Sequence, residues 1–199
     1  FDRANVTGKL ALQSSAASFG QLTALIGPLA PSLAARLNAM GDGSGAARAR
    51  LALELAKATA DRASAQLLLD VDAPQLKGSV TVAARPPISA VSLLDVEALR
   101  RSELEVGTNL VAARGHAMLA LLGLDRMLVG GEGPLRLEGG AIGAWGAPLQ
   151  LKAKLSGAGL EAEAQGSVEP FAPEAKADVS LRMAHANFAP LLDLKPTDA

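Results

Sequence analysis

The last third of the chain alternates between apolar and polar residues over three consecutive runs. The runs extend over residues 149–156, 160–169 and 175–183. In each run leucine, alanine, valine or methionine recurs at alternate positions, and charged or polar residues fill most positions between them. Because successive side chains of a strand point to opposite faces of a sheet, this period predicts three strands that share one apolar face.

The same one-sided alternation occurs earlier in the chain. It is present around residues 6–13, 51–55, 67–71 and 76–82, and it resumes at 135–137. Each of these runs predicts a further strand with an apolar face and a polar face. The later runs are separated by glycine-rich turns, of which Gly157-Ala158-Gly159 has the composition of a hairpin.

Residues 18–40 depart from this alternation and predict helical structure. Ser18 is a favoured N-cap residue, because its hydroxyl accepts a hydrogen bond from a backbone N–H of the first turn. Pro28 and Pro31 divide the segment into two short helices, since proline lacks the N–H that a helix interior needs. The glycine-rich stretch 41–45 predicts an exposed, flexible loop.

These patterns divide the chain into strand groups and helical segments. Residues 6–84 form the first strand group, with the helical segment described above as an insert. Apolar residues at helical spacing over 88–129 predict a second helical insert. Residues 135–185 form the second strand group, and 187–194 predicts a short helical cap. We expect one α+β domain over 1–199: a long, curved antiparallel sheet, apolar inside and polar outside, with helices that cap it or partly cover it.

The composition of the chain excludes several classes of function and kinds of site. The net charge of −1 over 199 residues provides no field that attracts nucleic acid. The absence of cysteine excludes disulfides, thiolate nucleophiles and cysteine-ligated metals. His116 and His185 lie far apart without acidic residues at ligand spacing, and Asp70 and Asp72 are interpreted as a solvated strand end. We therefore expect no catalytic residue, no cofactor and no metal site.

Three further residues have a structural and a functional interpretation. Glu161 and Glu163 lie on the polar face of their run, next to a lysine-bearing run, which favours cross-strand ion pairs over an acid–base pair. Trp145, the only tryptophan, is predicted to fill a corner of the sheet, with contact to a lipid or a partner as the alternative. A hydrolase has no recognisable nucleophile and base in this sequence.

Residues 76–199, roughly, resemble the C-terminal region of AsmA-family proteins. The resemblance consists of a Gly-x-Trp turn followed by an amphipathic run within 143–155, a paired amphipathic run at 159–166, and the closing segment 187–192. Asn187 stands where aspartate is common in the Asp-Leu-x-Pro-Leu pattern of that family.

This resemblance implies a non-enzymatic, periplasmic protein of the Gram-negative cell envelope, related to the TamB-like bridge proteins whose curved sheets carry lipid. It implies a role in outer-membrane assembly or in phospholipid transport between membranes. The chain begins without methionine and contains no run of about 18 apolar residues. We therefore expect a soluble piece of a longer protein, whose N-terminal inner-membrane helix lies outside this chain. The implied partners are phospholipid or another acyl lipid, and envelope proteins.

The apolar face of the predicted sheet needs a cover. An acyl chain fits, because a seven-residue strand extends about 23 Å and half of a bilayer's hydrocarbon is about 15 Å thick. In this interpretation the lipid-facing residues are Leu137, Leu151, Leu160, Val179 and Leu181. In the alternative, helices fill the face completely, and the chain is a structural adaptor domain that binds protein partners at exposed strand edges.

Overall fold

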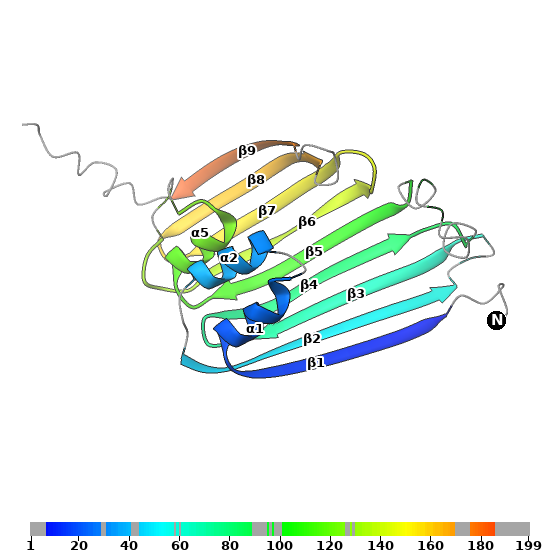
Figure 1. Ribbon diagram of the computed structural model, residues 1–199. Helices are drawn as coiled ribbons and strands as arrows, with labels where there is room; N and C mark the ends of the chain where they lie inside the picture. Colours follow the sequence, from blue (N-terminus) through cyan, green and yellow to red (C-terminus); the bar gives the residue numbers. More distant parts are fainter. Residues whose placement is uncertain are drawn as a thin grey trace, which may run out of the picture.

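The protein is a single open antiparallel sheet with few short helices, so it is mostly β rather than evenly α+β (Figure 1). The computed structural model describes residues 7–28, 31–40, 44–57, 59, 61–88, 95, 97, 101–125, 128, 130–169 and 176–185. The nine strands are β1 Gly8–Ser18, β2 Ser44–Lys57, β3 Ala63–Asp72, β4 Leu76–Arg85, β5 Glu103–Ala112, β6 Leu135–Ala144, β7 Leu149–Gly157, β8 Leu160–Glu169 and β9 Lys176–His185.

The strands lie in the sheet in the order in which they occur in the chain, from β1 to β9, and every neighbouring pair is antiparallel. One of the connections is a two-residue hairpin between β7 and β8. Ala158 and Gly159 both have positive φ, 52° and 74°, as a type I′ turn requires. The hairpin predicted from this glycine-rich turn is therefore confirmed.

The strand register aligns the apolar positions on one side of the sheet. Leu12 of β1 lies opposite Leu51 of β2, Leu51 lies opposite Leu69 of β3, and Leu69 lies opposite Val80 of β4. The same alignment continues to β9. We call this side the apolar face. It comprises the even-numbered residues of β1, β4, β5 and β8 and the odd-numbered residues of β2, β3, β6, β7 and β9, up to the register shifts after Ala16 of β1 and after Met183 of β9. The predicted antiparallel sheet with one apolar face is confirmed.

The opposite side, the polar face, carries ion pairs. The predicted pairing of Glu161 is confirmed, because Lys154 Nζ lies 3.2 Å from its Oε1. Glu163 lies opposite Lys154 in the register. A second cross-strand pair joins Lys9 Nζ and Glu54 Oε1 at 2.9 Å. Since these side chains are largely exposed, each pair contributes at most about 1 kcal/mol to stability, and their main effect is to keep this face in water.

Three helices lie on the apolar face, near one end of the strands (Figure 1). They are α1 Phe19–Ile26, α2 Pro31–Ala39 and α5 Gly115–Leu122. The two helices predicted within 18–40 are confirmed. The backbone N–H of Gln21 donates a 3.4 Å hydrogen bond to Ser18 Oγ, which confirms the predicted N-cap. Pro31 begins α2, where the missing N–H has no cost.

The main core lies between these helices and the sheet, at what we call the covered end of the strands. Met118 and Leu119 of α5 are 0% exposed, and they share one cluster with Phe19 of α1 and Leu135 of β6. A much smaller buried cluster lies toward the other end of the strands, the open end. It consists of Leu104, Ala141 and Leu149.

The structure corrects two predictions from the sequence. The helical insert predicted over 88–129 is wrong in part, because β5 occupies 103–112, whereas the eight-residue helix α5 at 115–122 confirms helical structure in its later part. The predicted loop 41–45 is also wrong in part, since Ser44 and Gly45 belong to β2 while 41–43 lie outside the described residues. The predicted cap at 187–194 lies outside them as well.

No helix in the described part of the chain has both the length and the hydropathy that crossing a membrane requires.

Candidate functional site

The apolar face is covered at one end and exposed elsewhere. The helices and the main core bury its covered end, whereas several large aliphatic side chains of the outer strands remain in contact with solvent. Their exposed fractions lie between 37% and 53%. We call these residues the open apolar surface: Leu10, Leu12, Leu53, Val179, Leu181 and Met183.

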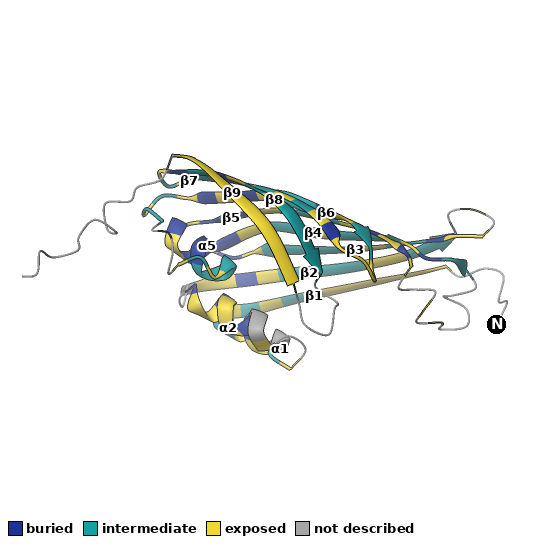
Figure 2. Ribbon diagram, turned by 90° about the horizontal axis from the view of Figure 1, so that it is seen from above, coloured by how far each residue is buried: buried dark blue, intermediate teal, exposed yellow. Residues whose placement is uncertain are grey.

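The position of these residues in the sheet explains their exposure. Leu10 and Leu12 lie on β1, and Val179, Leu181 and Met183 lie on β9, so each has a neighbouring strand on one side only among the described residues. Figure 2 shows exposed residues along the length of β9. Leu53 lies on β2, next to the β1 edge. On the other inner strands, the large side chains of the apolar face that lie outside the two buried clusters are half-buried by their neighbours within the sheet.

Solvent contact of this kind is unfavourable, so a ligand that covers the surface gains free energy. Complete burial of one large aliphatic side chain is worth about 1.5–3 kcal/mol. The six residues of the open apolar surface are already partly covered, and covering the remainder supplies on the order of several kcal/mol. The six residues form two groups at opposite edges of the sheet, one on β1 and β2 and the other on β9. Groups of exposed apolar residues in folded proteins mark sites of interaction.

The face is also nearly free of charge. Of all the apolar-face positions in the nine strands, only position 57, the last residue of β2, holds an aspartate, glutamate, lysine or arginine. The polar residues that occur within it, such as Thr108, are neutral. The described part of this face therefore suits an uncharged, apolar ligand.

All five residues predicted to face lipid lie on the apolar face, but helices and neighbouring strands cover them unequally. Val179 and Leu181 are 41% and 40% exposed and belong to the open apolar surface. Leu151 is half-buried and packs against the smaller cluster. Leu137 and Leu160 are 8% and 4% exposed within the main core. These last two do not line the exposed surface, because they lie in the cluster that α5 closes.

Four residues of the open apolar surface were not among the predicted lipid-facing residues, namely Leu10, Leu12, Leu53 and Met183. Their alternation with polar neighbours placed them on the correct face. Their exposure depends on where the helices lie and on which strands form the edges, and the alternation does not contain that information. One signal of this exposure was present in the sequence. The alternating run of 6–13, which contains Leu10 and Leu12, precedes the first predicted helix.

The polar face lacks a comparable apolar surface. A shallow hollow there is lined by acidic and basic side chains together, including Glu138, Lys152, Glu163 and Arg182. Among the described strand residues of this face, Ile142 is the one large aliphatic residue that is exposed, at 62%. The mixed charges keep the hollow hydrated and give it no strong preference for either sign of ligand.

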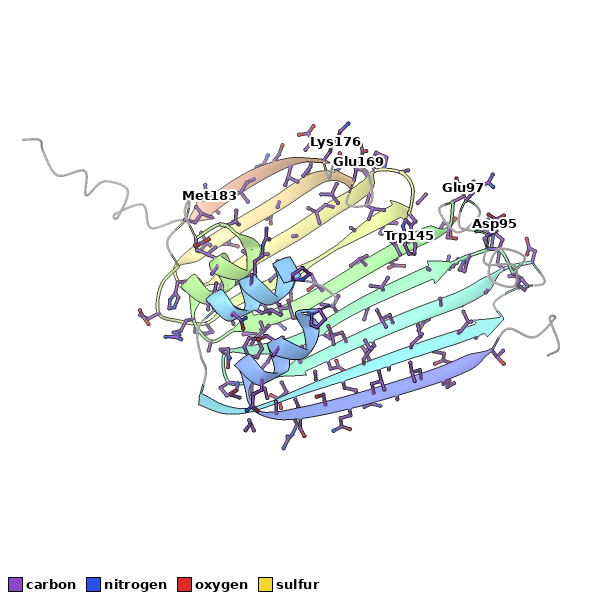
Figure 3. All side chains as sticks on the ribbon, viewed as in Figure 1. Asp95, Glu97, Trp145, Glu169, Lys176 and Met183 are labelled. Atoms are coloured by element: carbon purple, nitrogen blue, oxygen red, sulfur yellow. The ribbon has the colours of Figure 1, made fainter. Side chains whose placement is uncertain are left out.

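The described residues contain no group of three metal-ligating side chains. His116 is exposed at the beginning of α5, and Asp72 forms an ion pair with Lys77, 3.3 Å apart. Trp145 follows β6 in the turn to β7 and is 42% exposed (Figure 3). That Trp145 fills a corner of the sheet stays a prediction. Its backbone N–H donates a 3.0 Å hydrogen bond to the carbonyl oxygen of Ser102.

The open apolar surface is thus the candidate functional site, defined by its aliphatic side chains, its lack of charge and its position beside the helices. No known protein family, curated protein or solved structure was found to match the chain.

Proposed function

We propose that this chain binds the acyl chains of a phospholipid, or of another acyl lipid, on its open apolar surface. The proposed protein is non-enzymatic and of the AsmA type, takes part in outer-membrane assembly or in phospholipid transport between membranes, and lies in the periplasm with an inner-membrane anchor in the full-length protein. The observation that carries the proposal is a sheet face nearly free of charge, which the described helices cover at one end only. The location is supported by the sequence resemblance alone.

The dimensions of the face support an acyl ligand. A strand of ten residues extends roughly 33 Å, and nine strands spaced about 4.8 Å apart span roughly 40 Å across the sheet. Half of the hydrocarbon thickness of a bilayer, about 15 Å, fits within either dimension. An extended acyl chain therefore lies on this face without leaving it.

The alternative is an adaptor domain whose apolar face is closed by its own helices. Its core would resemble the covered end, where Met118 and Leu119 are fully buried. The exposed leucines of β1 and β2 favour the lipid-binding function, because a closed core leaves no reason to keep Leu10, Leu12 and Leu53 at 39% exposure or more.

Native mass spectrometry of the chain purified without detergent, combined with organic extraction, tests the proposal. We expect phospholipid to remain bound at a defined stoichiometry. A well-folded sample that carries no lipid, and takes up none from phospholipid vesicles, contradicts lipid binding and supports the adaptor.

A pair of matched substitutions locates the bound lipid. Leu12→Asp places a charge on the apolar face at a side chain that is 53% exposed, and Ile142→Asp places the same charge on the polar face at one that is 62% exposed. Because neither side chain is buried, both variants are expected to fold. Leu12→Asp is expected to reduce the amount of bound lipid at least about tenfold, since a carboxylate is costly to desolvate, and Ile142→Asp to leave it unchanged. Equal lipid content in the two variants contradicts binding on the apolar face.

A further inference from the structure

The outer edge of β9 is exposed. β9 pairs with β8, and no other described strand pairs with it. Residues 176–184 are all exposed (Figure 2). Strand edges of this kind present backbone N–H and C=O groups that another strand can pair with.

The strand number determines which partner strand fits. Because nine strands alternate in direction, β1 and β9 run the same way. A second copy that keeps its apolar face on the same side can approach β9 with its own β1 or with its own β9. Its β1 would lie parallel to β9, whereas its β9, related by a twofold axis perpendicular to the sheet, would lie antiparallel. The β9–β9 junction continues the antiparallel pattern, which is the more stable pairing per residue.

The sequence of β9 favours one register of this junction, in which Ser180 faces Ser180 of the second copy. Asp178 then lies opposite Arg182 of the other chain, twice by symmetry, and Val179 lies opposite Leu181. Opposite charges and aliphatic pairs in directly opposed positions stabilise antiparallel strands. Within one chain, neither Asp178 nor Arg182 forms an ion pair with a described residue. Glu163 is the acidic residue that lies opposite Arg182 on β8.

Other registers are worse. Centring the junction on Val179 places Lys176 opposite Arg182, and centring it on Asp178 or on Arg182 places like charges opposite each other. Centring it on Leu181 places Asp178 opposite Ala184 and Arg182 opposite Ser180, so no ion pair forms between directly opposed residues. A junction centred between two residues places apolar-face residues opposite polar-face residues, as a one-residue slip always does. At the other edge, Lys9 is the only charged residue of β1 and already pairs with Glu54, so β1 offers no such complementarity.

We propose that two copies of this chain associate through β9, antiparallel and centred on Ser180, to form one sheet of twice the width. The two apolar faces become continuous, and the exposed aliphatic side chains of β9 pack against their counterparts. This association does not depend on lipid binding, so either proposal can fail without the other.

Cysteine crosslinking tests the register. The chain contains no cysteine, so Ser180→Cys introduces a single thiol at the twofold axis. The Cα atoms of directly opposed antiparallel residues lie about 4.5–5.5 Å apart, within the range that a disulfide spans. We expect Ser180→Cys to form a disulfide-linked dimer under mild oxidation. Ser15→Cys is the matched control, because Ser15 is an exposed serine on the polar face of the other edge strand, and it is expected to remain monomeric on non-reducing gels. Equal crosslinking of the two variants overturns the proposal, as does a dimer that packs face to face and leaves Ser180→Cys uncrosslinked.

Charge reversal with rescue tests the ion pairs. Asp178→Arg places arginine opposite Arg182 at both symmetric positions, and we expect it to raise the dimer dissociation constant at least about tenfold in sedimentation experiments. The double variant Asp178→Arg with Arg182→Asp exchanges the charges and is expected to restore the wild-type constant. A wild-type chain that stays monomeric at all concentrations, or a double variant as weak as the single one, overturns the proposal.

Discussion

Gly78 lies where the backbones of β4 and β5 approach each other closely. Its φ is +134°, and a Cβ built on it would lie 2.0 Å from the backbone oxygen of Asn109. The need for glycine there was not predictable from the sequence, because Asn109 belongs to another strand. The N-cap at Ser18 and the turn at Ala158 and Gly159 were predictable, since residues close in the chain determine both.

We expect Gly78→Ala to lower the free energy of unfolding by about 1–3 kcal/mol for the backbone conformation alone, and further for the clash with a backbone atom that cannot move aside. Gly8→Ala is the control, because Gly8 has no positive φ and nothing within 4 Å of its Cβ position. Urea unfolding followed by circular dichroism measures both. Equal stability of the two variants would show that β4 and β5 are spaced more widely at this point.

At the scale of elements, strict alternation predicted most of the strands, and β5 was missed. Its apolar face contains the polar residue Thr108, and its polar face contains the non-polar residues Gly107 and Val111. The alternation of apolar and polar residues is therefore weak over 103–112. Val111, Met118, Leu121 and Leu122 occur at helical spacing, which extended the predicted helix into the strand. The helix α5 was correctly expected within 88–129, but its packing on the sheet depends on contacts between distant residues.

The burial of α5 makes its methionine a sensitive position. Met118 is 0% exposed in the main core, so Met118→Ala is expected to cost about 2–5 kcal/mol through lost contacts and the cavity left behind. Met183→Ala is the matched control, because the same side chain is 37% exposed on β9, and its expected cost is under about 1 kcal/mol. Chemical unfolding measures the difference. A small loss for Met118→Ala would mean that α5 does not close the covered end.

At the scale of the molecule, the two ends of the sheet differ in the size of their buried clusters. The covered end holds the main core, and the open end holds the small cluster around Leu104, Ala141 and Leu149. The side of the sheet to which residues such as Val179 and Leu181 belong was predictable from parity. Which of them remain exposed was not, because exposure is set by where three short helices pack.

This difference predicts that the open end loses structure first. Each strand pairs only with its sequence neighbours, so stability is distributed locally, as in repeat proteins. Trp145, the only tryptophan, lies in the turn at the open end and reports on it through fluorescence. We expect the unfolding transition followed by tryptophan fluorescence to have a lower urea midpoint than the transition followed by far-ultraviolet circular dichroism. The second signal reports on the strands and helices together. Coincident transitions would show instead that the sheet unfolds as one cooperative unit.

Because chain order equals spatial order in this sheet, its width is adjustable in steps. Inserting or deleting one hairpin adds or removes two strands, about 10 Å of sheet, and leaves the remaining pairings in register. The strand directions at both edges and the side on which the aliphatic residues lie are also preserved. In evolution, duplication or loss of hairpins can therefore widen or narrow the aliphatic surface of such a protein. Each intermediate is already a complete sheet.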